Sequence, residues 1–137
     1  MLDTNVVLDW LVFADPSSGP VAAAIAGHQV RWIATAAMRD ELAEVLRRGV
    51  GAGRGAEPAA ALATWDAHVA PHEEPRGLAA TVALHCSDAD DQKVLDLAHA
   101  AGARWLLSRD RAVLRLARRA AAFGIAITAP ESWSAPG

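Results

Sequence analysis

Short apolar segments alternate with longer amphipathic segments along almost the whole chain. Residues 30–34, 105–107 and 125–128 have the buried, apolar character of strands. Helices are expected around them, at residues 21–26, from Thr35 to about Arg48, and at residues 59–69, 88–101 and 111–121. Strands separated by helices at this spacing indicate βαβ units, whose strands are parallel and covered by helices on both faces. The alternation therefore predicts an α/β fold with a central parallel sheet.

The connecting segments are consistent with one domain, residues 1–137. Residues 5–13 are apolar at nearly every position and end at a turn-forming segment, residues 15–20. The glycine-rich stretch 49–58 is short enough to be a loop inside a domain, not a linker between two. Residues 71–77 are expected to form a polar connection, and residues 78–84 are ambiguous between helix and strand.

Composition excludes several classes of protein. The formal net charge is −3, so the chain has no global basic surface for nucleic acid, although arginines cluster at Arg47–Arg48 and between Arg109 and Arg119. The only cysteine, Cys86, cannot form an intramolecular disulfide, which suits a reducing, cytoplasmic setting. No apolar run is long enough to cross a membrane, and the start lacks the features of a signal peptide.

Acidic residues stand at four places where the predicted elements meet or on a helix face. Asp3 follows a short apolar start, and Asp110 follows the strand at residues 105–107. Glu41 lies in the helix that follows the strand at residues 30–34, and the Asp88-Ala89-Asp90-Asp91 run opens the helix at residues 88–101. In a parallel sheet these places converge on the edge formed by the carboxyl ends of the strands. An oxygen-only set of this kind suits Mg²⁺ or Mn²⁺, and the zinc signatures are absent.

Each acidic residue also has a purely local explanation. Asp3 and Asp110 stand where helix N-caps are expected. Glu41 has the position of a solvated helix carboxylate, and its neighbours Asp40 and Glu44 compete for any role assigned to it. The 88–91 run would interact favourably with the helix dipole. Their predicted convergence favours a functional site. Two unit charges ~5 Å apart repel by roughly 3 kcal/mol at an effective dielectric of 20, so several carboxylates in one pocket need protonation, cations or a bound metal.

A metal held by several carboxylates suits phosphodiester hydrolysis, because the metal lowers the pKa of bound water. The chain has no GxGxxG or GxxxxGK[ST] motif, and no Ser-His-Asp or Cys-His arrangement is detectable. Two arginines at or just before the start of the last predicted helix, Arg109 and Arg111, are candidates to bind nucleic acid, and a role as solvated helix residues explains them equally well.

Four segments of the chain resemble the PIN domain family in order and spacing. They are residues 2–8 (LDTNVVL), 41–46 (ELAEVL), 88–98 (DADDQKVLDLA) and 103–110 (ARWLLSRD), and the closing residues 128–133 resemble that family's last strand and tail. The resemblance implies a three-layer α/β/α sandwich, with a strand within residues 78–84. It also implies a Mg²⁺- or Mn²⁺-dependent ribonuclease acting on RNA, commonly a toxin restrained by a small antitoxin protein, and look-alikes are commonly homodimers.

Functional residues are carried over from the resemblance by motif. Asp3 and Asp91 would be the principal metal ligands, and Glu41 would complete the ligand set or hold a ligating water. Asp110 would support the metal, and Asp88 is an additional candidate beside Asp91. Two further residues, Asn5 and Ser108, would orient the carboxylates.

One departure from the family pattern concerns the first strand. Only Met1 and Leu2 precede Asp3, whereas family members usually carry several apolar residues there. Either the start is mis-assigned, or the chain is trimmed, or the strand is shortened. A shortened central strand would lose ladder hydrogen bonds and apolar burial beside the site, which would reduce both stability and activity. Two rival functions are a domain that binds RNA or a partner without cutting, and a phosphatase or phosphotransfer domain. The latter would need an acid at the position of Asn5.

Overall fold

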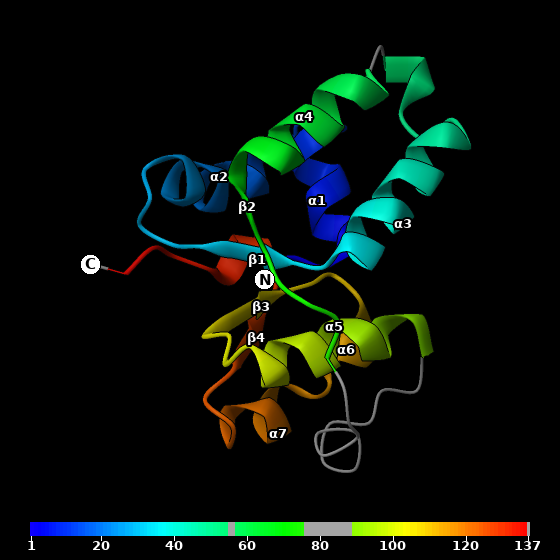
Figure 1. The fold of residues 1–137 in the computed structure, drawn as a ribbon. Helices are drawn as coiled ribbons and strands as arrows, with labels where there is room; N and C mark the ends of the chain where they lie inside the picture. Colours follow the sequence, from blue (N-terminus) through cyan, green and yellow to red (C-terminus); the bar gives the residue numbers. More distant parts are fainter. Residues whose placement is uncertain (55–56, 76–88, 137) are drawn as a thin grey trace.

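The computed structural model describes residues 1–54, 57–75 and 89–136 of the chain. Short strands occupy the middle of the molecule, with helices α1–α4 on one side and α5–α7 on the other (Figure 1). This layering confirms the predicted α/β fold. The elements are α1 (Thr4–Leu11), η1 (Pro16–Ser18), α2 (Gly19–Ala26), β1 (Trp32–Ala34), α3 (Ala36–Arg47), η2 (Ala52–Arg54), α4 (Pro58–His68), β2 (Val69–Pro71), α5 (Ala89–Ala100), β3 (Trp105–Leu107), α6 (Arg111–Leu114), α7 (Ala117–Ala121), β4 (Ala126–Thr128) and η3 (Pro130–Ser132).

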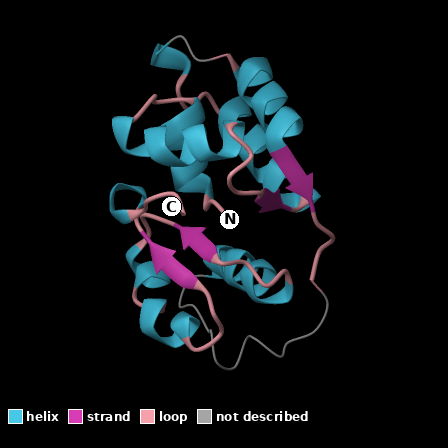
Figure 2. Cartoon of the chain, turned by 90° about the vertical axis from the view of Figure 1, so that its left-hand side faces the viewer, coloured by secondary structure: helices cyan, strands magenta, loops and turns pink. Residues whose placement is uncertain are grey.

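The strands form two parallel pairs, β1 with β2 and β3 with β4 (Figure 2). Within the described residues these pairs are separate two-stranded sheets. The start of the chain pairs with β3 through a single bridge between Leu2 and Leu107. Three hydrogen bonds hold it: Met1 N to Trp105 O (2.9 Å), Leu107 N to Met1 O (3.0 Å) and Asp3 N to Leu107 O (2.9 Å). This pairing places Asp3 beside the end of β3.

Tryptophans fill much of the core on the side of α1–α4. Trp32 of β1 is almost fully buried, and its ring lies against Trp10 of α1 and Trp65 of α4, with centroid distances of 5.3 and 4.9 Å. On the other strand pair, Trp133 packs edge-on against Trp105 at 5.7 Å. Burial of large aromatic side chains dominates the energy of a core of this size.

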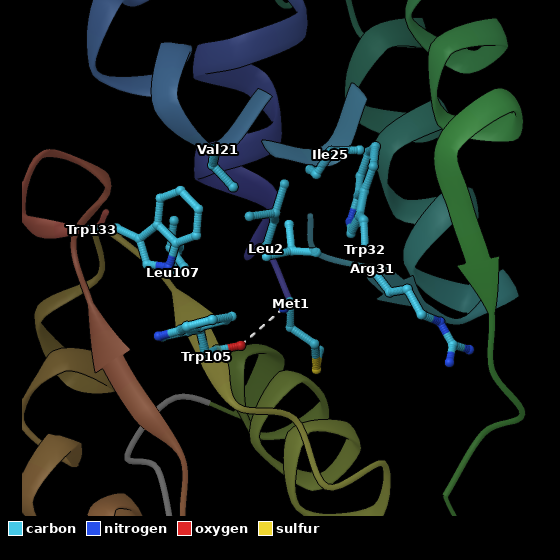
Figure 3. A pocket seen from close by; sticks show the side chains of 10 residues that line it. Met1, Leu2, Val21, Ile25, Arg31, Trp32, Trp105, Leu107 and Trp133 are labelled. Carbon is cyan, nitrogen blue, oxygen red and sulfur yellow. Dashed lines mark hydrogen bonds between the residues drawn. The ribbon is translucent and has the colours of Figure 1, made fainter. Parts of the chain in front are cut away.

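A cavity of about 30 Å³, partly open to solvent, lies beside Met1 (Figure 3). Apolar side chains and the rings of Trp32, Trp105 and Trp133 line it. The indole nitrogens of Trp32 and Trp133 are buried and have no hydrogen-bond partner in the described part of the chain. Burial of the amino group of Met1 lowers its pKa from 8.0 to about 5.

Local sequence signals explain where several helices begin and end. Asp3, Thr35 and Asp110 are the N-caps of α1, α3 and α6, and each side chain accepts a hydrogen bond from a backbone N–H of the first turn. After α5, Gly102 adopts φ +63°, a left-handed conformation that glycine takes readily and that commonly follows the last residues of a helix.

The structure corrects two of the predicted elements. A helix is expected over residues 59–69 and a polar connection over residues 71–77. Between them the structure has β2, an edge strand of three residues whose last residue is Pro71. A proline is tolerated on an edge strand, so it does not exclude one. The expected helix over 111–121 is two helices: α6 packs against α5 and β4, and α7 packs along β4. The expected strand within residues 78–84 lies outside the described residues.

Candidate active site

Asp3 is the centre of the candidate site. It lies between the bridge at Leu2 and the start of α1, and it is only 4% exposed. One carboxylate oxygen, Oδ1, accepts from the backbone N–H of Thr4 at 2.8 Å. The other, Oδ2, accepts from the Ser108 hydroxyl at 2.7 Å and from the Asn5 side-chain amide at 3.4 Å. Both oxygens are thereby fixed in direction, as a ligand or a catalytic carboxylate requires.

The segment after β3 brings three further residues to Asp3. Ser108 is fully buried, and its hydroxyl oxygen also accepts from the backbone N–H of Asp110 at 3.0 Å. Asp110 caps α6 through a bond from Ala112 N to its Oδ1 at 2.8 Å. The backbone N–H of Arg109 donates to Asn5 Oδ1 at 3.1 Å, which orients the amide that donates to Asp3. The predicted residues Asp3, Asn5, Ser108 and Asp110 therefore form one connected group.

Burial and a neighbouring charge both act on Asp3. Desolvation by burial raises the pKa of its carboxyl group, and the negative charge of Asp110 raises it further. Hydrogen bonds from Ser108, Thr4 and Asn5 act in the opposite direction, and the net pKa remains above the ordinary value of 3.8. The two carboxylates are therefore close enough to repel, and the local capping role of each coexists with this interaction.

The chemistry of the group fits a hard divalent cation. Neither Asp3 nor Asp110 makes a salt bridge within the described residues. The ion pairs found there are formed by other acidic residues. Asp110 Oδ2 accepts no hydrogen bond in that part of the chain. Two unneutralised carboxylates that already repel each other are the oxygen donors that Mg²⁺ or Mn²⁺ prefers.

The other predicted site residues are placed less completely. Asp91 is the third residue of α5, but the description of that helix does not extend to its side chain, and Asp88 lies outside the described residues. Glu41 is half-buried on α3. Among the side chains that are described, no three acidic, histidine or cysteine residues form a metal-binding group. The structure thus brings together the Asp3 part of the predicted set and leaves the roles of Glu41, Asp88 and Asp91 as predictions.

Arg109 lies in a different environment from the one expected for an RNA contact. Its guanidinium donates to Asp9 of α1 and to Ser17 of η1, and it pairs with Asp15 at 3.8 Å and with Glu131 of η3 at 3.0 Å. We call these five residues the Arg109 cluster. Desolvation lowers the pKa of Arg109, but the hydrogen bond and charge of Asp9 and the charges of Glu131 and Asp15 outweigh it, so the pKa is raised. Arg111, by contrast, is exposed.

Sequence reasoning missed the acidic members of the Arg109 cluster. Asp9 follows Asn5 by four residues, so both lie on one face of α1, and this spacing was available as a signal. Glu131 comes from a tail segment more than twenty residues after Arg109, and no local pattern links the two.

The comparisons agree with this arrangement. The model of the PIN domain family matches residues 1–112, which contain every predicted site residue. Among curated proteins and solved structures, none matches the chain significantly. In the described ranges no helix is long and apolar enough to cross a membrane. With the match covering most of its length and the acidic group at the strand ends in place, the chain belongs to the PIN domain family.

Proposed function

We propose that this protein is a Mg²⁺- or Mn²⁺-dependent endoribonuclease that hydrolyses single-stranded RNA. PIN domains are generally nucleases, so family membership supports a nuclease fold. The observation that carries the more specific proposal is Asp3: a buried carboxylate, oriented by Ser108 and Asn5 and repelled by Asp110, with no salt bridge among the described residues. A charged group of this kind is costly in a folded protein unless it is protonated or binds a cation.

The residues of this chain would divide the work as follows. Asp3 and Asp91 would hold the metal, with Asp110 beside them and Glu41 completing the set or holding a water. When bound there, Mg²⁺ or Mn²⁺ would supply a water of lowered pKa as the source of the nucleophile near neutral pH. The Ser108 hydroxyl and the Asn5 amide hold the Asp3 carboxylate in one orientation, so no reorganisation is needed during the reaction. Hydrolysis then forms one P–O bond from water and breaks another, and the leaving oxygen takes a proton.

We further propose a cytoplasmic toxin restrained by a small antitoxin protein, acting as a homodimer. This part rests on the resemblance of the four sequence segments to such toxins. Arg111 remains the candidate for contact with RNA phosphates, because it is exposed and forms no ion pair in the described part of the chain.

The test is cleavage of an end-labelled, mixed-sequence single-stranded RNA with Mn²⁺ or Mg²⁺. Internal cuts are expected with metal, and none with EDTA or in Asp3→Asn and Asp91→Asn variants. Asp66→Asn is the matched control, because it removes an exposed acid on α4 whose partner is Arg39. Metal-independent cutting, or equal cutting by the Asp3 variant, would contradict the proposal. RNA binding without cutting would favour the rival, a domain that binds and does not hydrolyse.

A further inference from the structure

The Arg109 cluster joins four separate segments of the chain beside Asp3. Arg109 follows β3, Asp9 lies on α1, Asp15 and Ser17 lie at η1, and Glu131 lies on η3. The Arg109 side chain is 32% exposed, and the Asp9 side chain is only 20% exposed. One cation thus stands among three carboxylates. Charge-assisted bonds at a partly buried site are stronger than exposed ion pairs, so this contact restrains the segments that it joins.

The same arginine is connected to Asp3 through its backbone. Its N–H donates to Asn5, and Asn5 donates to Asp3, while its side chain donates to Asp9 one turn further along α1. Arg109 therefore holds α1 at two successive turns, once by the backbone and once by the guanidinium. Displacement of its side chain would loosen α1 against the segment that carries Ser108 and Asp110.

The tail of the chain takes part in this arrangement. Glu131 and Trp133 follow the last residue of the family match, which ends at residue 112. Glu131 pairs with Arg109, and Trp133 is buried against Trp105 of β3. The tail is thus fixed to β3 by an apolar contact and to the segment after β3 by an ion pair.

We propose that Arg109 is a positioning residue of the active site and that Glu131, from the tail, completes its cluster. The proposal rests on the function proposed above, since it concerns the orientation of Asp3 toward a divalent cation. The Arg109 side chain contacts four partners within this chain, which distinguishes Arg109 from the exposed Arg111.

Electrostatics and positioning predict opposite effects on metal affinity. If Arg109 acted only through its charge, its removal would strengthen the binding of a cation at Asp3, because like charges repel. If it positions Asn5 and Ser108, its removal weakens that binding, as substitution of residues behind metal ligands typically does by 10–100-fold. The sign of the change in affinity therefore separates the two roles.

The experiment measures the dissociation constant of Mn²⁺ by titration with electron paramagnetic resonance, on the full chain, well below the melting temperature of each variant. Arg109→Gln is expected to bind Mn²⁺ about tenfold more weakly than the parent. Arg109→Lys keeps the charge but not the fork of N–H donors, so it should lose affinity as well. Arg47→Gln is the matched control, because Arg47 pairs with Glu44 on the exposed face of α3. Unchanged or tighter binding in both Arg109 variants would overturn the proposal.

Two further readouts complete the test. The double variant Arg109→Gln/Glu131→Gln removes one charge of each sign, so a pure charge effect largely cancels while the loss of positioning persists. In metal-free protein, the side-chain amide of Asn5 should exchange its hydrogens faster in the Arg109→Lys variant, and an unchanged rate would also overturn the proposal.

If the parent binds Mn²⁺ but cuts no RNA, the nuclease proposal fails while the order of affinities still decides the role of Arg109. If the parent binds no Mn²⁺, the Asn5 readout alone decides it.

Discussion

The buried amino group of Met1 leads to a quantitative prediction about stability. Met1 carries the short first strand that ends at Asp3, and its nitrogen donates to Trp105 O inside the fold. Burial lowers the pKa of this amino group from 8.0 to about 5. At about 1.36 kcal/mol per pKa unit, charging the amine in the folded protein costs about 4 kcal/mol. Acetylation of the amine removes this titration and keeps an N–H donor for Trp105.

The sign follows from proton binding. Between about pH 5 and pH 8 the unfolded chain holds the proton and the folded chain does not, so the free energy of unfolding rises with pH, by about 1.4 kcal/mol per unit. The acetylated chain lacks this dependence. Its advantage over the free amine should be about 4 kcal/mol at pH 5 and about 1.4 kcal/mol at pH 7, and it should disappear above pH 8. These are large parts of a total stability of roughly 5–15 kcal/mol.

The assay is urea unfolding of both forms at several pH values between 5 and 9. The difference between the two forms isolates the amine, because histidines and carboxylates titrate in both. A difference that stays constant with pH would refute the reasoning, because it would show that the amine is solvated in the folded state.

Three other outcomes can be checked on the same material. Because the pKa of the Asp3 carboxyl group is raised in the folded protein, its ionisation lowers the metal-free stability as the pH rises above 3.8. Asp3→Asn should therefore raise the metal-free melting temperature at pH 7. The same variant should abolish the increase in melting temperature that Mn²⁺ produces in the parent. Charge reversal at the exposed Arg111 should weaken RNA binding and reduce its salt slope by about 1, and an unchanged slope would show that Arg111 contacts no phosphate. Leu106→Ala, at a fully buried position of β3, should cost about 2–5 kcal/mol in chemical unfolding. Arg47→Ala, at an exposed ion pair, should cost less than about 1 kcal/mol, and equal losses would contradict the burial argument.

Much of the candidate site could be read from the sequence because its determinants are local. Asp3, Thr35 and Asp110 stand directly before helices, where the preference for side chains that cap the first turn is strong, and all three are observed as N-caps. Placing Asp3 and Asp110 at the ends of apolar strands then predicted their proximity, since parallel strands end at one edge. The effect of Asp110 on the pKa of Asp3 shows that proximity.

Other features depended on contacts between distant segments and had no local signal. A three-residue edge strand such as β2 is defined by its pairing with β1 and not by its own composition. The break between α6 and α7 is marked by no proline or glycine in the sequence, and both helices pack on β4.

The role of Arg109 shows the same division most clearly. From the sequence alone, an arginine at the start of a helix in a suspected nuclease is a reasonable RNA contact. Only the tertiary structure brings Asp9 and Glu131, from α1 and η3, to its guanidinium. The sequence by itself determined the strands β1, β3 and β4, the helix caps and the acidic residues at the strand ends, because backbone geometry and apolar periodicity are local properties. The tertiary structure decided which charges meet, because the partners of a charge depend on how separate elements pack.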